Sequence, residues 1–149
     1  MAKISNVDAG RLIVQPVADV ELDELVALYE AIGWSAYTKA PEILRAAIAG
    51  SSFVVVARRG PRLVGLARAV SDTATICYLQ DVLVLPDEQR NGIGRALVQA
   101  ILDRYRTVRQ KVLLTDNEPS QRAFYESLGF TETRDHPPGT LRAFVRFDT

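Results

Sequence analysis

The stretch that most constrains the fold is VLVLPDEQRNGIGRAL, residues 82–97, where an apolar strand pattern gives way to a helix pattern across a short polar loop. A strand that leads through a loop into a helix predicts a helix packed on one face of a sheet. Gly92 and Gly94 stand at the start of that helix. Because glycine inside a helix costs roughly 1 kcal/mol relative to alanine, the pair indicates that bare backbone N–H groups are needed there.

The segments on either side alternate between strand and helix patterns, without repeats or an obvious linker. Apolar runs and alternation predict strands at residues 11–17, 51–59, 62–70, 75–85, 111–115 and 140–147. Helical spacing predicts helices at residues 19–33, with Asp19 as N-cap, and at residues 40–50, 92–105 and 119–129. We therefore expect one mixed α/β domain over residues 1–149, with the order β-α-α-β-β-β-α-β-α-β-β and its first strands antiparallel.

The composition of the chain argues against several classes of protein and kinds of site. Eighteen basic and eighteen acidic residues balance, which argues against a general nucleic-acid or membrane-surface binder. One cysteine, Cys77, and one histidine, His136, provide neither an internal disulfide nor a His-rich metal site, so we expect no metal. The chain shows no signal-peptide pattern and no apolar run near ~20 residues. These features predict a cytoplasmic protein without a membrane segment.

The two glycines do not match the common nucleotide-binding loops. A Rossmann fingerprint needs a third glycine where Leu97 stands and an acidic residue near Leu114, and no Walker string is present. Two glycines that simply begin a helix remain one interpretation. The other is an anion site, in which first-turn N–H groups and the helix dipole attract a phosphate and Arg90 and Arg95 add positive charge. A pyrophosphate is the expected ligand.

The run Gln89-Arg90-Asn91-Gly92-Ile93-Gly94 resembles the Q/R-x-x-G-x-G/A signature of the GCN5-related N-acetyltransferase (GNAT) family, and the later run RAFYESLGF resembles the family's tyrosine-bearing helix. The resemblance covers roughly residues 12–147 and implies the acyl-CoA N-acyltransferase fold, with a central, mostly antiparallel sheet flanked by helices. It also implies acetyl-coenzyme A as co-substrate. The residues expected to contact it are Val82, Leu83 and Val84 through backbone N–H groups, and Gln89, Arg90, Asn91, Gly92, Ile93, Gly94, Arg95 and Ala96 around the phosphates.

The same resemblance suggests residues for the chemistry. Tyr125 stands where the family places the general acid that protonates the thiolate, although it also fits an ordinary half-buried helix aromatic. Leu113 occupies the place of a common glutamate base. Asp81 is the nearest carboxylate and either holds the amine, bridges to water or is simply solvated. Glu118 replaces the family's usual asparagine, so Asn117 or Ser120 is expected to meet the cofactor instead.

The acceptor pocket is expected around AIGWSAYTKAPE, where Trp34 and Tyr37 can present an aromatic wall, unless Trp34 fills the core. The sequence thus predicts transfer of an acetyl group from acetyl-coenzyme A to a primary amine, on a small molecule or a peptide, by direct attack on the thioester. A coenzyme-A-binding sensor without turnover is the alternative. We expect no nucleic acid or membrane partner, and a homodimer is left open.

Overall fold

The computed structural model describes residues 10–137, 139 and 141–148, and the chain divides into two compact units, one ending at Leu114 and the other beginning at Thr115. The first unit contains a five-stranded sheet in the order β1-β2-β3-β4-β5. Its strands are β1 (Leu12–Pro16), β2 (Phe53–Arg59), β3 (Arg62–Ser71), β4 (Ile76–Val84) and β5 (Gln110–Leu113). The first four strands pair antiparallel, and β5 joins β4 in parallel. The predicted mixed, mostly antiparallel sheet is confirmed.

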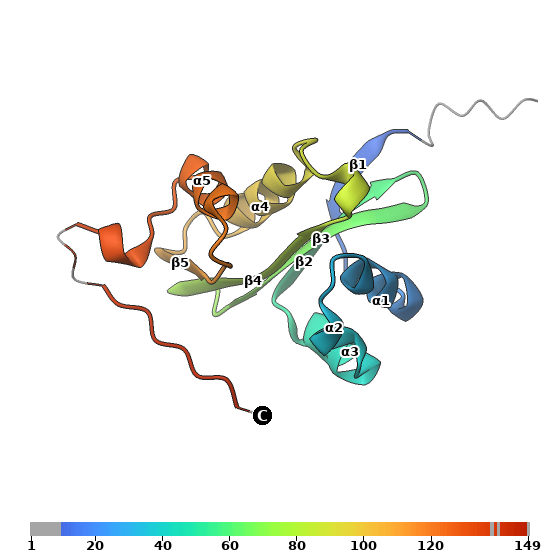
Figure 1. Ribbon diagram of the computed structural model, residues 1–149, viewed down its shortest axis with the longest axis horizontal. Helices are drawn as coiled ribbons and strands as arrows, with labels where there is room; N and C mark the ends of the chain where they lie inside the picture. Colours follow the sequence, from blue (N-terminus) through green and yellow to red (C-terminus); the bar gives the residue numbers. More distant parts are fainter. Residues whose placement is uncertain (1–9, 138, 140, 149) are drawn as a thin grey trace, which may run out of the picture. The chain divides into compact units, whose positions relative to one another are not determined.

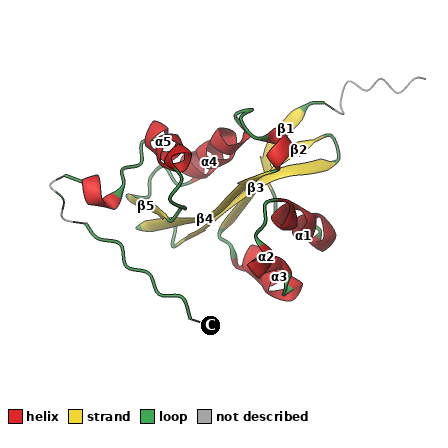
Figure 2. Ribbon diagram, in the orientation of Figure 1, coloured by secondary structure: helices red, strands yellow, loops and turns green. Residues whose placement is uncertain are grey.

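Helices cover both faces of this sheet. One face carries α4 (Ile93–Arg104), and the other carries α1 (Leu22–Ala31), α2 (Ser35–Thr38) and α3 (Pro41–Gly50) (Figures 1 and 2). Because both faces are covered, β3 is buried almost from end to end. No described helix has the length and apolar character needed to cross a bilayer.

Gly65 sets how closely α4 approaches the sheet. A Cβ at this position would lie 3.1 Å from the carbonyl oxygen of Leu83 and 3.1 Å from Cδ1 of Leu97 in α4. Ile93 of α4 is almost as near, at 3.3 Å. The missing side chain therefore allows the start of α4 to pack directly onto β3 and β4, which fixes the loop that precedes the helix.

A β-bulge in β4 changes which residues face which helices. Arg68 pairs with Asp81 but the next residue of β3, Ala69, pairs with Leu79, so Gln80 is an extra residue in β4. Extra residues of this kind re-aim the side chains beside them. Gly65, which faces α4, pairs with Val84; alternation then places Asp81 on the opposite face, with α1 and α2. The bulge was not predicted from the sequence.

The N-terminal helix begins later than predicted. Its N-cap is Glu21 rather than Asp19, whose carboxylate accepts the N–H of the adjacent Val20 at 2.9 Å. That local bond leaves Asp19 outside the helix. The additional short helix α2 follows Gly33, whose positive φ of 81° ends the preceding helical segment as expected.

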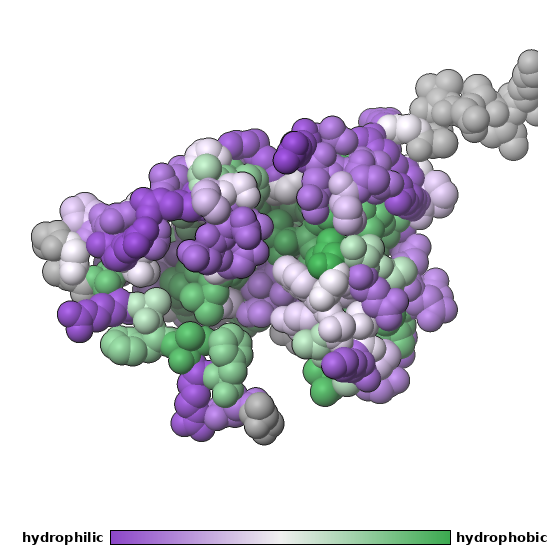
Figure 3. Space-filling view, viewed as in Figure 1, coloured by the Kyte–Doolittle hydropathy of each residue, from purple (hydrophilic) through white to green (hydrophobic). Residues whose placement is uncertain are grey.

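The second unit contains α5 (Pro119–Ser127) and a 3-10 turn at Thr133–Asp135. The helix α5 confirms the prediction at residues 119–129, and Gly129 follows it with φ at 90°. The strand predicted at residues 140–147 is wrong for the described residues 141–147, and with it the end of the predicted element order. A strand needs a hydrogen-bonded neighbour, and the described part of this unit offers none. Phe144 and Phe147 are consequently exposed at 90% and 86%, and apolar residues line the C-terminal segment in Figure 3.

Candidate active site

The loop between β4 and α4 is held by two adjacent side chains near its middle, Glu88 and Gln89. Glu88 accepts two hydrogen bonds of 2.9 Å from Nε of Arg59 on β2, and its side chain is largely buried. The amide Nε2 of Gln89 donates to the carbonyl oxygen of Val84 at 3.1 Å. Gln89 therefore fastens the loop to the end of β4, in addition to any contact with a ligand.

Two residues of this loop have left-handed backbone. Arg90 has φ of 66° and Gly92 has φ of 78°, and Gly92 is the N-cap of α4 without a side-chain cap. A left-handed arginine is uncommon and marks a backbone constrained by its surroundings. A Cβ at Gly92 would meet no heavy atom within 4 Å, so the space in front of this turn is open. The turn thus presents the positive end of the α4 dipole to an open surface, as an anion site requires.

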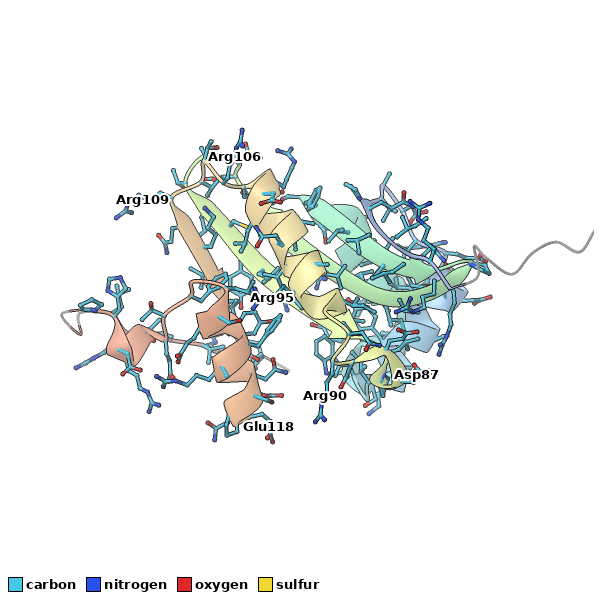
Figure 4. The ribbon with its side chains drawn as sticks, turned by 90° about the horizontal axis from the view of Figure 1, so that it is seen from above. Asp87, Arg90, Arg95, Arg106, Arg109 and Glu118 are labelled. Carbon is cyan, nitrogen blue, oxygen red and sulfur yellow. The ribbon has the colours of Figure 1, made fainter. Side chains whose placement is uncertain are left out.

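Charged residues lie beyond both ends of α4. Figure 4 shows Asp87 and Arg90 on the loop before the helix, with Arg90 projecting outward, and Arg106 and Arg109 beyond its other end. Asp87 is paired with Arg62 at 3.1 Å in an exposed ion pair. Arg90 is the exposed cation of the left-handed turn itself.

Beyond the bulge, one edge of β4 lacks a strand partner among the described residues. Pairing with β5 ends at Leu79, opposite Leu113. The N–H of Leu85 donates to the carbonyl of Val64 at 2.9 Å, so Leu83 and Leu85 direct their backbone groups toward β3. Since backbone groups alternate along an antiparallel strand, Val82 and Val84 direct theirs to the open edge. Leu83 instead places its N–H in the ladder and its side chain in the core, at 2% exposure.

An open hollow of about 420 Å³ lies on the α1 and α2 side of β4, and its lining includes Trp34, Tyr37, Gln80 and Asp81. The rings of Trp34 and Tyr37 are 6.2 Å apart, and each also contacts the ring of Tyr29, at 5.9 and 5.2 Å. Trp34 is 37% exposed, so it forms a wall of this hollow and does not fill the core. The structure therefore brings together Trp34, Tyr37 and Asp81.

Asp81 is buried, and one of its carboxylate oxygens accepts two hydrogen bonds. Its Oδ2 accepts hydrogen bonds from Nε of Arg68 at 2.6 Å and from the hydroxyl of Tyr29 at 2.7 Å. Burial, followed by the negative charge of Asp81, raises the pKa of Tyr29 far above its usual value. Desolvation lowers the pKa of Arg68, but attraction and hydrogen bonding to Asp81, together with smaller contributions from Tyr29, outweigh it, and the net shift of this pKa is upward. Asp81 is therefore not the solvated carboxylate that the sequence allowed.

Tyr29 and Arg68 were not identified from the sequence. Tyr29 continues the apolar face of α1 four residues after Leu25, so it resembles a core aromatic. Arg68 offered one signal, because it is a charged residue inside the apolar run RLVGLARAV. A buried arginine requires a partner, and the partner proves to be Asp81 on the neighbouring strand.

Three candidates, Tyr125, Asn117 and Ser120, belong to the second unit. Tyr125 lies on α5, partly buried, with its ring 4.9 Å from that of Phe124 and 5.8 Å from that of Phe130. Burial, with a smaller effect of Asp116, raises the pKa of Tyr125 to about 12. Asn117 and Ser120 are exposed where α5 begins.

Comparison with known proteins identifies the family. The family model described as "Acetyltransferase (GNAT) domain" matches residues 27–140. An uncharacterized N-acetyltransferase, ycf52, of Pyropia yezoensis is 29% identical over 126 residues, which cover 81% of this chain and 71% of that protein. The solved structure of a GNAT-family acetyltransferase from Streptococcus pneumoniae TIGR4 has a TM-score of 0.77 and 29% identity, covering 93% of this chain and all of that one.

A further solved structure shares the fold at lower identity. AAC(6')-Iy, solved with the bisubstrate analog CoA-S-monomethyl-acetylneamine, has a TM-score of 0.70 and 16% identity, covering 94% of this chain and all of that one. The family match extends over most of the chain and includes both the glycine loop and α5. The chain is therefore an acyltransferase enzyme that belongs to the GNAT acetyltransferase family.

Proposed function

We propose that the chain transfers an acetyl group from acetyl-coenzyme A to a primary amine by direct attack of the amine on the thioester. The observation that carries the proposal is the open edge of β4 at Val82 and Val84, which continues through the Gln89 hydrogen bond into the left-handed turn before α4. An open backbone edge beside a helix N-terminus suits a ligand that has an amide-bearing arm and a phosphate group.

The residues around this edge fit coenzyme A. The turn formed by residues 89–96 would hold the pyrophosphate through its backbone, with Arg90 and Arg95 adding positive charge. Val82 and Val84 would bind the pantetheine arm and the acetyl carbonyl. Asn117 or Ser120, at the start of α5, would add a polar contact. Acetyl-coenzyme A itself supplies an acetyl group activated as a thioester.

We assign the protonation of the departing thiolate to Tyr125. Its raised pKa, about 12, keeps the phenol protonated throughout the physiological range, as a proton donor must be. Asp81 would hold the amine or a bridging water through Oδ1, because Oδ2 is occupied by Arg68 and Tyr29. Before the attack, the ammonium acceptor loses one proton to water. After the attack its nitrogen loses a second proton, which replaces the one that Tyr125 gives to the thiolate, so Tyr125 ends protonated.

The acceptor would bind in the hollow walled by Trp34 and Tyr37. Aromatic rings bind both apolar groups and cations, so the walls suit an amine on a carbon skeleton. We extend the proposal to the whole chain, residues 1–149, as one acetyltransferase domain.

A second candidate is a coenzyme-A-binding sensor without turnover. It is favoured by Leu113 in the place of the glutamate base and by the ion pair that engages Asp81. This candidate keeps the phosphate turn and predicts binding of acetyl-coenzyme A without release of the thiol.

Two measurements test the proposal. A thermal-shift titration with acetyl-coenzyme A should raise Tm, since a ligand that binds only the folded state stabilises it. A panel of primary amines, scored by the appearance of free coenzyme A thiol with active and with heat-inactivated protein, should reveal at least one acceptor. A Tm shift without thiol release for any amine would favour the sensor, and no Tm shift would overturn both candidates.

A further inference from the structure

Among the residues that the structure describes, the hollow beside α2 is lined by only one charged residue. Asp81 carries a carboxylate, whereas the other lining residues are neither acidic nor basic side chains of the Asp, Glu, Lys, Arg or His type: Gly33, Trp34, Ser35, Ala36, Tyr37 and Gln80. No lysine or arginine is among them. The chemistry of the hollow therefore depends on what Asp81 presents to it.

The two oxygens of Asp81 have different surroundings. Oδ2 accepts two short hydrogen bonds, from Arg68 and from Tyr29, at 2.6 and 2.7 Å. Oδ1 has a 3.5 Å contact with the hydroxyl of Tyr37, at the outer limit for a hydrogen bond. That hydroxyl in turn accepts from Nε2 of Gln80 at 3.3 Å. Oδ1 thus retains capacity for a stronger donor on the side of Tyr37, which lines the hollow.

Arg68 fixes the carboxylate without presenting its own charge to the hollow. Its side chain is 8% exposed, and Nη1 lies 3.3 Å from Oγ of Ser51. Its Nε is committed to Oδ2 of Asp81. The hollow consequently contains one anionic oxygen and the aromatic rings of Trp34 and Tyr37, an arrangement that favours a cation with an apolar substituent.

We infer that the hollow selects an acceptor whose ammonium group donates to Oδ1 of Asp81 and has no carboxylate on the adjacent carbon. Alkylamines, polyamines and side-chain amines belong to this class, and free α-amino acids do not. Arg68 and Tyr29 are positioning residues, because they hold Oδ2 and leave Oδ1 to the acceptor. The inference rests on the proposed function, because only that function makes the bound amine an acetyl acceptor.

The exclusion of α-amino acids follows from charge. With the ammonium at Oδ1, a carboxylate on the next carbon would lie close to that of Asp81, in a partly desolvated site. Like charges at such a distance repel. Arg68 is already paired with Asp81 through Oδ2, and the described lining contains no second cation that could pair with the carboxylate of the ligand. The same carbon skeleton without its carboxylate avoids this cost.

Trp34 provides a direct readout of binding. It is the sole tryptophan of the chain and lines the hollow. We would follow its fluorescence while titrating 2-phenylethylamine, 2-phenylethanol and phenylalanine, which share a ring and differ in charge. The amine should bind at least about tenfold more tightly than the alcohol or the amino acid, equivalent to about 1.4 kcal/mol. Cadaverine and lysine form a second matched pair without a ring.

A paired substitution tests the role of Asp81 without leaving a buried charge. Arg68→Met combined with Asp81→Asn removes both charges together, which proteins tolerate better than loss of one partner. The preference for 2-phenylethylamine over 2-phenylethanol should then disappear, while the affinity for acetyl-coenzyme A is retained. Asp23→Asn, an exposed carboxylate on α1, is the control and should keep the preference. Tyr37→Phe, which keeps the ring and frees Oδ1, should preserve or increase it.

Three results would overturn the inference: equal or tighter binding of phenylalanine, equal binding of the alcohol, or no fluorescence change with any ligand. If the paired variant fails to fold, the comparison among the three ligands on the parent protein still decides the matter. Selective binding of the amine without thiol release would contradict the proposed function, and the selectivity of the hollow for amines without a carboxylate would still stand. Thiol release with phenylalanine as the preferred acceptor would do the reverse.

Discussion

Substitution of Gly92 should affect two measurable quantities for different reasons: the stability of the fold and the affinity for acetyl-coenzyme A. Gly92 has φ of 78°, and a Cβ placed there meets no heavy atom within 4 Å. Alanine in this region costs about 1–2 kcal/mol through its own backbone alone. For a chain of this size, Gly92→Ala should therefore lower Tm by about 2–8 °C without disturbing the packing around it.

The same Cβ should weaken acetyl-coenzyme A binding, because it occupies the open space through which a phosphate must approach the N–H groups at the start of α4. Loss of even one charge-assisted hydrogen bond is worth about 1.5–3 kcal/mol, which corresponds to at least about a tenfold rise in Kd. Gly92→Val should have a larger effect, since a branched side chain is disfavoured at positive φ. Isothermal titration calorimetry at 25 °C, where both variants remain folded, measures this Kd.

Gly129 provides the matched control. It has φ of 90°, it also has no heavy atom within 4 Å of an added Cβ, and it follows α5 rather than the phosphate turn. Gly129→Ala should lower Tm by a similar amount and leave the Kd for acetyl-coenzyme A unchanged. Parent-like binding by Gly92→Ala, or equal weakening by the two variants, would refute the assignment of the turn.

Four further predictions concern the reaction, the pH dependence of stability and the buried pair. Trp34→Ala should raise the KM of the amine with little change in acetyl-coenzyme A affinity, and steady-state kinetics would contradict this if KM stayed constant. Tyr125→Phe should lower kcat by about 10²-fold while the fold is retained, and a change within about twofold, with chemistry rate-limiting, would exclude Tyr125 as the acid. Burial raises the pKa of Tyr125 from 10 to about 12, so the neutral phenol contributes to the stability of the folded state in full below pH ~10. This contribution should disappear as the pH rises from about 10 toward 12. Denaturant titrations should show the loss in the parent protein but not in Tyr125→Phe. Arg68→Met alone should lower the free energy of unfolding by about 3–5 kcal/mol by leaving Asp81 buried without its cation, and chemical denaturation should show a smaller loss for the paired variant with Asp81→Asn.

The sequence predicted the elements whose signals are local. Apolar spacing and terminal glycines located α1, α3, α4 and α5, and the pair Gly92 and Gly94 indicated the turn at the start of α4 that the structure leaves open. The strand predicted at residues 140–147 had the right alternation, but alternation cannot supply a neighbouring strand. Strand pairing depends on parts of the chain distant in sequence, and the described residues 141–148 have none.

The candidate site was also predicted only where its residues are close together in the sequence. Trp34 and Tyr37 are three residues apart, so a shared wall was a reasonable inference from spacing. The contacts of Asp81 join positions 52 and 13 residues away in the sequence, Tyr29 and Arg68, and no local pattern indicates them. Of this network, only the charge of Arg68 in an apolar strand was visible in advance.

The extra residue Gln80 reverses which face of the sheet the odd-numbered residues of β4 occupy. Before it, odd-numbered Cys77 lies near Tyr105 at the end of α4, whereas beyond it odd-numbered Asp81 lies with Tyr29 of α1. A point substitution at residue 80 preserves this reversal, but deletion of Gln80 would give β4 one uninterrupted alternation of side chains between the two faces. Either the hydrophobic residues before position 80 or the carboxylate after it would then turn to the wrong face. A family of sequences related to this chain should therefore tolerate substitution of residue 80, within the limits set by the hollow that it lines, far better than any change in the length of β4.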